Sequence, residues 1–124
     1  MDGARRSSLR GLPPDRVAVV QRRRILSAAP ATLAERGGYE RTVVRDVIEC
    51  AGISRRTFYD QFESRADVFR TAYDESFEHL YKEVAVAYFA QERWAESVAA
   101  GVQAALECSA LDPLGANMIL IEPL

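Results

Sequence analysis

Residues 43–69, VVRDVIECAGISRRTFYDQFESRADVF, predict two short helices joined by a tight turn and followed by the start of a long helix. Apolar residues recur at spacings of three and four from Val43 to Ala51, which is typical of one buried helix face. Thr42 precedes this run, where a side-chain oxygen can cap the first turn. After it, Gly52 tolerates positive φ and Ser54 can cap the next helix.

The second short helix has a thin apolar stripe and a polar outer face. Phe58 and Phe62 lie four residues apart and are predicted to be core, with arginine, threonine, tyrosine and glutamine around them. Two helices joined by a short glycine turn, the second with polar side chains facing outward, form the arrangement by which a helix-turn-helix reads the major groove of DNA. The pattern therefore predicts a DNA-binding element.

Residues 51–69 strongly resemble the DNA-binding segment of the TetR family of bacterial transcriptional regulators. The family pattern is roughly Thr-x-x-Arg-Asp-Ile-Ala, then Ala-Gly-Val-Ser-x-x-Thr-Leu-Tyr-x-x-Phe, then Ser-Lys-x-x-Leu. The sequence departs from it at Ile48, where the family usually has Ala, and at Arg65, where it usually has Lys. The resemblance covers residues 16–73 well and the rest loosely. The matching residues, identical or of like type, are Thr42, Arg45, Asp46, Val47, Ala51, Gly52, Ile53, Ser54, Thr57, Phe58, Tyr59, Phe62, Ser64 and Phe69.

The resemblance implies an all-α fold, in which a three-helix helix-turn-helix head joins a partial helical sensor domain through a long fourth helix. It implies a sequence-specific transcriptional regulator, a repressor that binds a palindromic operator as a dimer and is released by a small apolar effector. Relatives usually continue for several more helices, so we expect residues 64–124 to be a truncated effector and dimerisation domain. A homodimer is then expected only if the missing helices are present. No effector-binding residue is assigned.

Arg55 opens the recognition helix, where a guanidinium can bond the edge of a guanine with two donors. By resemblance, Arg45 approaches a base or its phosphate, and Arg65 grips a phosphate at the start of the next helix. Arg56 faces either a base or solvent, and the sequence leaves this open. The threonine, tyrosine and glutamine of the recognition helix correspond to family positions that contact phosphate or a base edge. The full predicted DNA-binding set is Thr42, Arg45, Ser54, Arg55, Arg56, Thr57, Tyr59, Gln61 and Arg65.

Residues 1–14 contain Gly, Pro and three arginines, and they predict a flexible basic arm that either enters a minor groove or has no defined role. Residues 15–63 are the expected helix-turn-helix domain. Its first helix should begin at Asp15, which caps it, and end near Arg36. Pro30 removes a backbone hydrogen bond, so a kink or break is expected there. The predicted buried face of this helix is Val20, Ile25, Leu26, Ala29 and Leu33.

The region after the helix-turn-helix predicts a long helix at about 65–88, another at about 91–108 and a short apolar element at 113–121. Ser64 and Asp67 form a capping-box-like start for the long helix. Its aromatic residues keep a helical period for many turns and would leave a large apolar patch unless covered. An alternative function is therefore a helical protein-interaction module, whose exposed apolar fourth helix binds a partner or self-associates.

Charge is unevenly distributed along the 124 residues, although the net charge is only −2. Residues 1–70 hold 14 arginines and 9 acidic residues, whereas residues 71–124 hold 2 basic and 9 acidic residues. A basic front and an acidic back fit a nucleic-acid-binding head joined to a part that stays off DNA. Cys50 and Cys108 have no nearby Cys or His partner, so no metal or cofactor is expected. A single histidine without a catalytic constellation argues against an enzyme. Without a membrane span or a secretion signal, the expected location is cytoplasmic.

Overall fold

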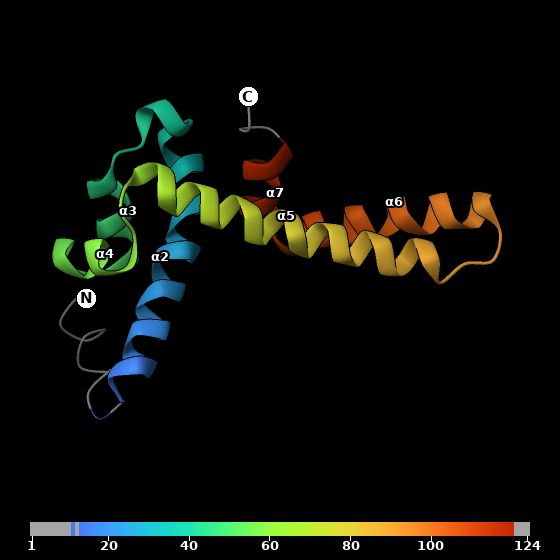
Figure 1. Ribbon diagram of the computed structural model, residues 1–124. Coiled ribbons are helices and arrows are strands. Elements are labelled where there is room, and N and C mark those ends of the chain that lie inside the picture. Colours follow the sequence, from blue (N-terminus) through green and yellow to red (C-terminus); the bar gives the residue numbers. More distant parts are fainter. Residues whose placement is uncertain (1–10, 12, 121–124) are drawn as a thin grey trace. The chain divides into compact units, whose positions relative to one another are not determined.

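The computed structural model describes residue 11 and residues 13–120, and in them it contains helices and no strand, which confirms the predicted all-α class (Figure 1). The predicted arm at residues 1–14 lies mostly outside the described residues. The chain divides into two compact units, residues 1–72 and residues 73–124. The elements are α2 (Pro14–Arg36), the 3-10 turn η1 (Tyr39–Arg41), α3 (Val44–Ala51), α4 (Arg55–Gln61), α5 (Arg65–Phe89), α6 (Trp94–Leu111) and α7 (Pro113–Leu120).

The boundary between the units lies inside α5, later along the chain than the position 63/64 expected from the sequence. The reason is burial, because Val68, Phe69 and Ala72 on the first turns of α5 are all less than a tenth exposed. These turns belong to the core of the first unit together with Leu33 of α2 and Val47 of α3. α5 is thus one continuous helix shared by two compact units.

α2 differs from its predicted form at both its start and its middle. Its N-cap residue is Pro13 and no side chain caps it, so the predicted Asp15 cap is wrong; Asp15 lies in the first turn. There its carboxylate faces the positive end of the helix dipole. The helix also runs unbroken through Pro30, whose missing N–H costs about 3 kcal/mol in a helix interior. Pro30 is buried with Ala29 and Leu33, and this packing holds the two halves of α2 in one helix.

α3 and α4 form the predicted helix-turn-helix and lie beside α2 in the first unit (Figure 1). Gly52 ends α3 with φ 68°, in the left-handed region that glycine adopts without a Cβ penalty. Ser54 is the N-cap of α4, as predicted, and its Oγ accepts from the Thr57 N–H at 3.1 Å. The predicted cap at the other helix is wrong, because Val43 and not Thr42 is the N-cap residue of α3.

The second unit contains the later turns of α5 together with α6 and α7. Its interhelical approach is close at the buried Gly101 of α6, where an added Cβ would lie 3.6 Å from Val84 Cγ1 of α5. Asp112 Oδ1 accepts from the Gly115 N–H at 3.1 Å and thereby closes the first turn of α7. None of the helices in the described range has both the length and the apolar character needed to cross a membrane.

Candidate nucleic-acid interface

The rotation of α4 about its axis is set by one buried aromatic side chain. Phe58 is 0% exposed and lies with its ring centroid 6.0 Å from that of Phe62. Because consecutive helix positions are about 100° apart, burying Phe58 turns Arg56 and Tyr59 away from the core, while Arg55 lies at the first position of the helix. All three are exposed, Tyr59 to 47%. The outward-facing polar surface expected from the sequence is therefore present, while contact with DNA remains a prediction.

Ser54 and Thr57 form the N-terminal end of this surface. Ser54 Oγ accepts from the Thr57 backbone N–H at 3.1 Å and lies 2.9 Å from Thr57 Oγ1. Both residues are half-buried. Their hydroxyls face each other across the first turn of α4, which fixes where the helix begins. The structure therefore gives them a capping role, in addition to the DNA contact predicted for them.

Arg45 adds an exposed cation on α3. The next residue, Asp46, points back into the protein, where its Oδ1 lies 2.8 Å from Arg36 Nη2. Its other oxygen accepts from the Val43 N–H at 2.9 Å. Asp46 thus binds a cation of α2 and leaves Arg45 as the charged side chain at the surface of this turn.

Thr42 was predicted to bind DNA, and the structure contradicts that prediction. Its side chain is 0% exposed, and Thr42 Oγ1 donates to the Gly38 carbonyl at 2.8 Å. Its backbone N–H donates to the Tyr39 carbonyl at 3.1 Å. A hydroxyl that is buried and already bonded does not reach a phosphate, so Thr42 is a residue of the core below the interface.

Arg65 was predicted to bind a phosphate. In the structure its guanidinium is hydrogen-bonded to residues of the first unit. Arg65 Nη1 donates to the carbonyls of Tyr39 at 2.9 Å and of Thr42 at 2.8 Å. Its Cζ also lies 4.0 Å from the centroid of the Tyr39 ring, a cation–π distance. Arg65 thus joins α5 to the segment before α3, and its predicted phosphate contact stays a prediction.

Gln61 is likewise turned toward α2 rather than outward. Its side-chain Nε2 donates to the Ala18 carbonyl at 3.2 Å. The backbone carbonyl of Gln61 accepts from Arg22 Nη1 at 3.4 Å. Arg22 Cζ lies 4.6 Å from the Phe62 ring centroid. These contacts hold the C-terminal end of α4 on α2. Sequence reasoning missed Arg22 here, because no local pattern distinguishes it from the neighbouring arginines.

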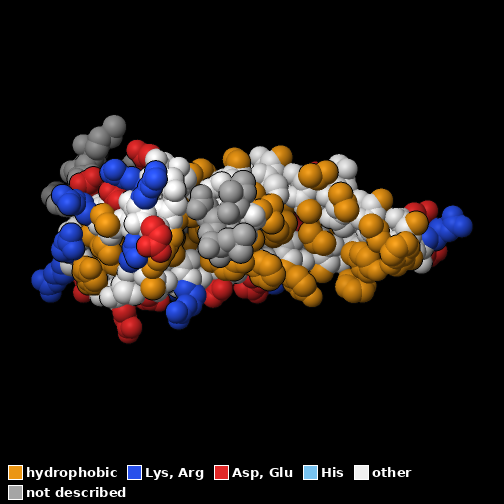
Figure 2. Space-filling view, turned by 90° about the horizontal axis from the view of Figure 1, so that it is seen from above, with side chains coloured by type: hydrophobic (Ala, Val, Ile, Leu, Met, Phe, Trp, Pro, Cys, Tyr) orange, Lys and Arg blue, Asp and Glu red, His pale blue; other side chains and the backbone are white. Residues whose placement is uncertain are grey.

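The surface that remains for DNA consists of the outer face of α4 with the adjoining turn of α3. Figure 2 shows Lys and Arg side chains gathered over the helix-turn-helix unit, with acidic side chains among them. A basic surface on a helix-turn-helix is the electrostatic footprint expected of a DNA-binding protein. Its exposed cations on these two helices are Arg45, Arg55 and Arg56.

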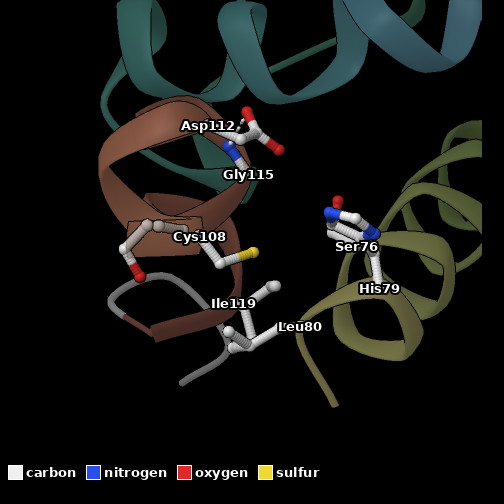
Figure 3. Close-up of a pocket in the computed structure, with 9 residues that line it drawn as sticks. Ser76, His79, Leu80, Cys108, Asp112, Gly115 and Ile119 are labelled. Atoms are coloured by element: carbon white, nitrogen blue, oxygen red, sulfur yellow. Dashed lines mark hydrogen bonds between the residues drawn. The ribbon is translucent and has the colours of Figure 1, made fainter. Parts of the chain in front are cut away.

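The second unit contains a small hollow between α5, α6 and α7, in which Ser76 and His79 face Cys108 and the turn of Asp112 (Figure 3). An adjoining open hollow of about 250 Å³ shares three of these residues and adds the carboxylates of Glu83 and Glu107. Burial raises the pKa of the Cys108 thiol, and the carboxylates of Glu83 and Asp112 raise it further. No group of His, Cys, Asp and Glu side chains in the described part of the chain could hold a metal ion.

Residues 25–72 match the family model described as bacterial regulatory proteins, tetR family. The match begins within α2 and ends at Ala72, the last residue of the first unit. It therefore includes the whole helix-turn-helix and all of the predicted DNA-binding residues, from Thr42 to Arg65. No curated protein matched the chain.

Proposed function

We propose that this chain, whose residues 25–72 match the tetR family of bacterial regulatory proteins, is a DNA-binding transcription regulator that represses transcription from a palindromic operator. The observation that carries this proposal is the outer face of α4, on which Arg55, Arg56 and Tyr59 are exposed while Phe58 is fully buried. A short helix held in this rotation presents its N-terminal side chains to the floor of a major groove. A cytoplasmic location follows from this proposal, since duplex DNA is the partner.

In the proposed complex, Arg55 reads a guanine through its O6 and N7 atoms, a pairing worth about 1–3 kcal/mol of base discrimination. Arg45 and Tyr59 contact phosphate oxygens on the two sides of the groove and fix the register of α4, as such contacts generally do. Arg56 faces the same side and reads a second base or a phosphate. Base specificity thus comes from Arg55, with Arg56 adding to it where it reads a base, and affinity is shared among all four side chains.

A palindromic operator requires two copies of this chain, whose recognition helices enter major grooves about 34–36 Å apart. A small apolar effector would release the repressor by changing that spacing through α5, the helix that the two units share. Repression, the dimer and the effector are proposals that rest on the family match and on this geometry.

The test begins with the full chain and a pool of random-sequence duplexes. Repeated selection should enrich a palindrome, and binding to it should weaken as salt rises, with a slope of about −0.9 in log K for each phosphate neutralised. Adding unselected duplex as competitor measures the specificity ratio in the same titration. Binding that is absent, or that does not change with salt, would reject the proposal.

A second candidate function is a protein-interaction module, and the apolar surface of the second unit favours it. On α5 the rings of Tyr73, Phe77 and Tyr81 stack in succession, with centroids 6.2 and 6.5 Å apart. Phe77 is 48% and Tyr81 64% exposed, and on α6 Leu106 is 64% exposed. Figure 2 shows apolar side chains gathered over the part of the molecule formed by α5 and α6. Contiguous apolar patches on a soluble monomer are usually interaction sites. Light scattering against concentration, without DNA, distinguishes self-association by this surface from a monomer.

A further inference from the structure

We propose that Arg65 is a positioning residue for DNA binding, which acts by fixing the segment before α3 to the first turn of α5 and not by touching phosphate. The inference rests on the proposed function, because it concerns how the DNA-binding surface is held. It goes beyond that function because it assigns Arg65, a cation of the DNA-binding unit, to a contact inside that unit. Through this contact the first turn of α5 is joined to the segment that leads into α3 and α4.

The contact is made by one planar group with three partners. Arg65 Nη1 donates to the Tyr39 and Thr42 carbonyls at 2.9 and 2.8 Å, and its Cζ lies 4.0 Å from the Tyr39 ring centroid. That ring in turn meets the Phe69 ring edge-on, with centroids 5.5 Å apart. Arg65 and Phe69 are one turn apart on α5, so this helix holds both the backbone and the ring of Tyr39.

The segment held in this way leads directly into the helix-turn-helix. Thr42 is fully buried, and its hydroxyl donates to the Gly38 carbonyl at 2.8 Å, which makes the segment from Gly38 to Thr42 a closed turn. The next residue, Val43, is the N-cap of α3. A shift at Thr42 therefore displaces the start of α3, and with it α4, which follows through the tight turn at Gly52.

The geometry requires an arginine and not merely a positive charge. A guanidinium is planar, so it can stack on a ring while its edge donates to two carbonyls, whereas an ammonium is a compact charge without a face or a fork. Both hydrogen bonds come from Nη1, so lysine at this position would keep the charge and lose the planar face that lies on the Tyr39 ring. This difference separates the present proposal from a phosphate contact, for which an ammonium also serves.

The experiment compares Arg65→Lys, Arg65→Gln and Tyr39→Leu in the full chain, with Tyr39→Phe as the matched control that keeps the ring. The probes are the duplex that the wild type enriches from a random pool and an unselected duplex. We expect Arg65→Lys and Tyr39→Leu to bind the enriched duplex about tenfold more weakly, because both lose the contact between the guanidinium face and the Tyr39 ring. Affinity for the unselected duplex and the salt slope should not change, and Tyr39→Phe should match the wild type.

Two results would overturn the proposal. One is wild-type affinity in Arg65→Lys together with a salt slope reduced by about 0.9 in Arg65→Gln, which indicates a neutralised phosphate. The other is equal loss on both duplexes, or loss of helical circular dichroism, in Arg65→Lys and Tyr39→Leu, which indicates a merely structural residue. The wild-type titration is read first. Its failure to bind any duplex would reject the proposed function itself and is distinct from either of these results.

Discussion

The guanidinium of Arg36 lies 2.8 Å from Asp46 Oδ1, so the last residue of α2 is ion-paired with the first turn of α3. The second oxygen of the same carboxylate accepts from the Val43 N–H at 2.9 Å. One side chain therefore caps α3 and ties it to α2. The Asp46 side chain is 11% exposed, whereas that of Arg36 is 51% exposed. Water therefore screens the charge of Arg36 in the ion pair more than it competes for the Asp46 carboxylate.

Replacing Asp46 by Ala should lower the free energy of unfolding by about 1–2 kcal/mol. The lost cap accounts for most of this, because removing an N-terminal cap typically costs about 1 kcal/mol, and a half-exposed ion pair adds less than about 1 kcal/mol. Urea unfolding of the full chain followed by circular dichroism measures the change. Arg36→Gln is the matched control, since it removes the ion pair and leaves the cap. An equal loss in the two variants would contradict the cap as the main contribution.

Replacing Arg55 by Ala should reduce operator affinity by about 5- to 150-fold, the equivalent of the 1–3 kcal/mol assigned to a bidentate contact with guanine. The side chain is exposed, so the melting temperature should stay within a few degrees of that of the wild type. Competition between the selected palindrome and variants of it at each base pair measures the effect. Lys82→Ala removes a cation of the second unit and serves as the control. Full operator discrimination in Arg55→Ala would refute the role of Arg55.

Local signals in the sequence were sufficient for the helix-turn-helix itself. Gly52 and Ser54 act on neighbours within four residues, and the four-residue spacing of Phe58 and Phe62 determines the buried face of α4. Each of these features is decided by the residues around it. The all-α class, the turn and the outward face of α4 followed from them because no distant contact was needed.

The roles of Thr42, Gln61 and Arg65 could not be predicted in the same way. Arg65 bonds to carbonyls 26 and 23 residues away, and the Gln61 side chain bonds to a carbonyl 43 residues away. Backbone carbonyls are present at every position, so the sequence carries no signal for which one an arginine will find. Family resemblance assigned these residues to DNA, whereas the fold uses their polar groups to hold its own segments together.

Two glycines of the second unit should respond to alanine in opposite directions. At Gly101 a Cβ would lie 3.6 Å from Val84 Cγ1, an ordinary contact, so Gly101→Ala should stabilise the chain by about 0.4–1 kcal/mol by reducing the entropy of the unfolded state. At Gly115 a Cβ would collide with the Asp112 carboxylate, which accepts the Gly115 N–H at 3.1 Å. Gly115→Ala should therefore destabilise α7. Urea midpoints of the two variants, measured together, test the opposed signs, and a shift in the same direction for both would contradict the packing described here.

The Cys108 thiol should ionise at a higher pH than an ordinary cysteine. Burial raises its pKa because it disfavours the thiolate, and the negative charges of Glu83 and Asp112 act in the same direction. Removing one of these charges should lower the pKa and speed alkylation, since the thiolate is the reactive form. In a Cys50→Ser background, where Cys108 alone reports, Glu83→Gln should therefore shift the pH profile of iodoacetamide labelling to lower pH.

Glu96→Gln is the control for that experiment, because this exposed residue in the first turn of α6 is not among the groups that raise the pKa of Cys108. Mass spectrometry of the labelled chain against pH gives both profiles. If Glu83→Gln left the profile unchanged while Asp112→Asn moved it, Asp112 would be the effective charge. A profile at or below that of a free cysteine in the parent background would contradict the burial of the thiol between the helices of the second unit.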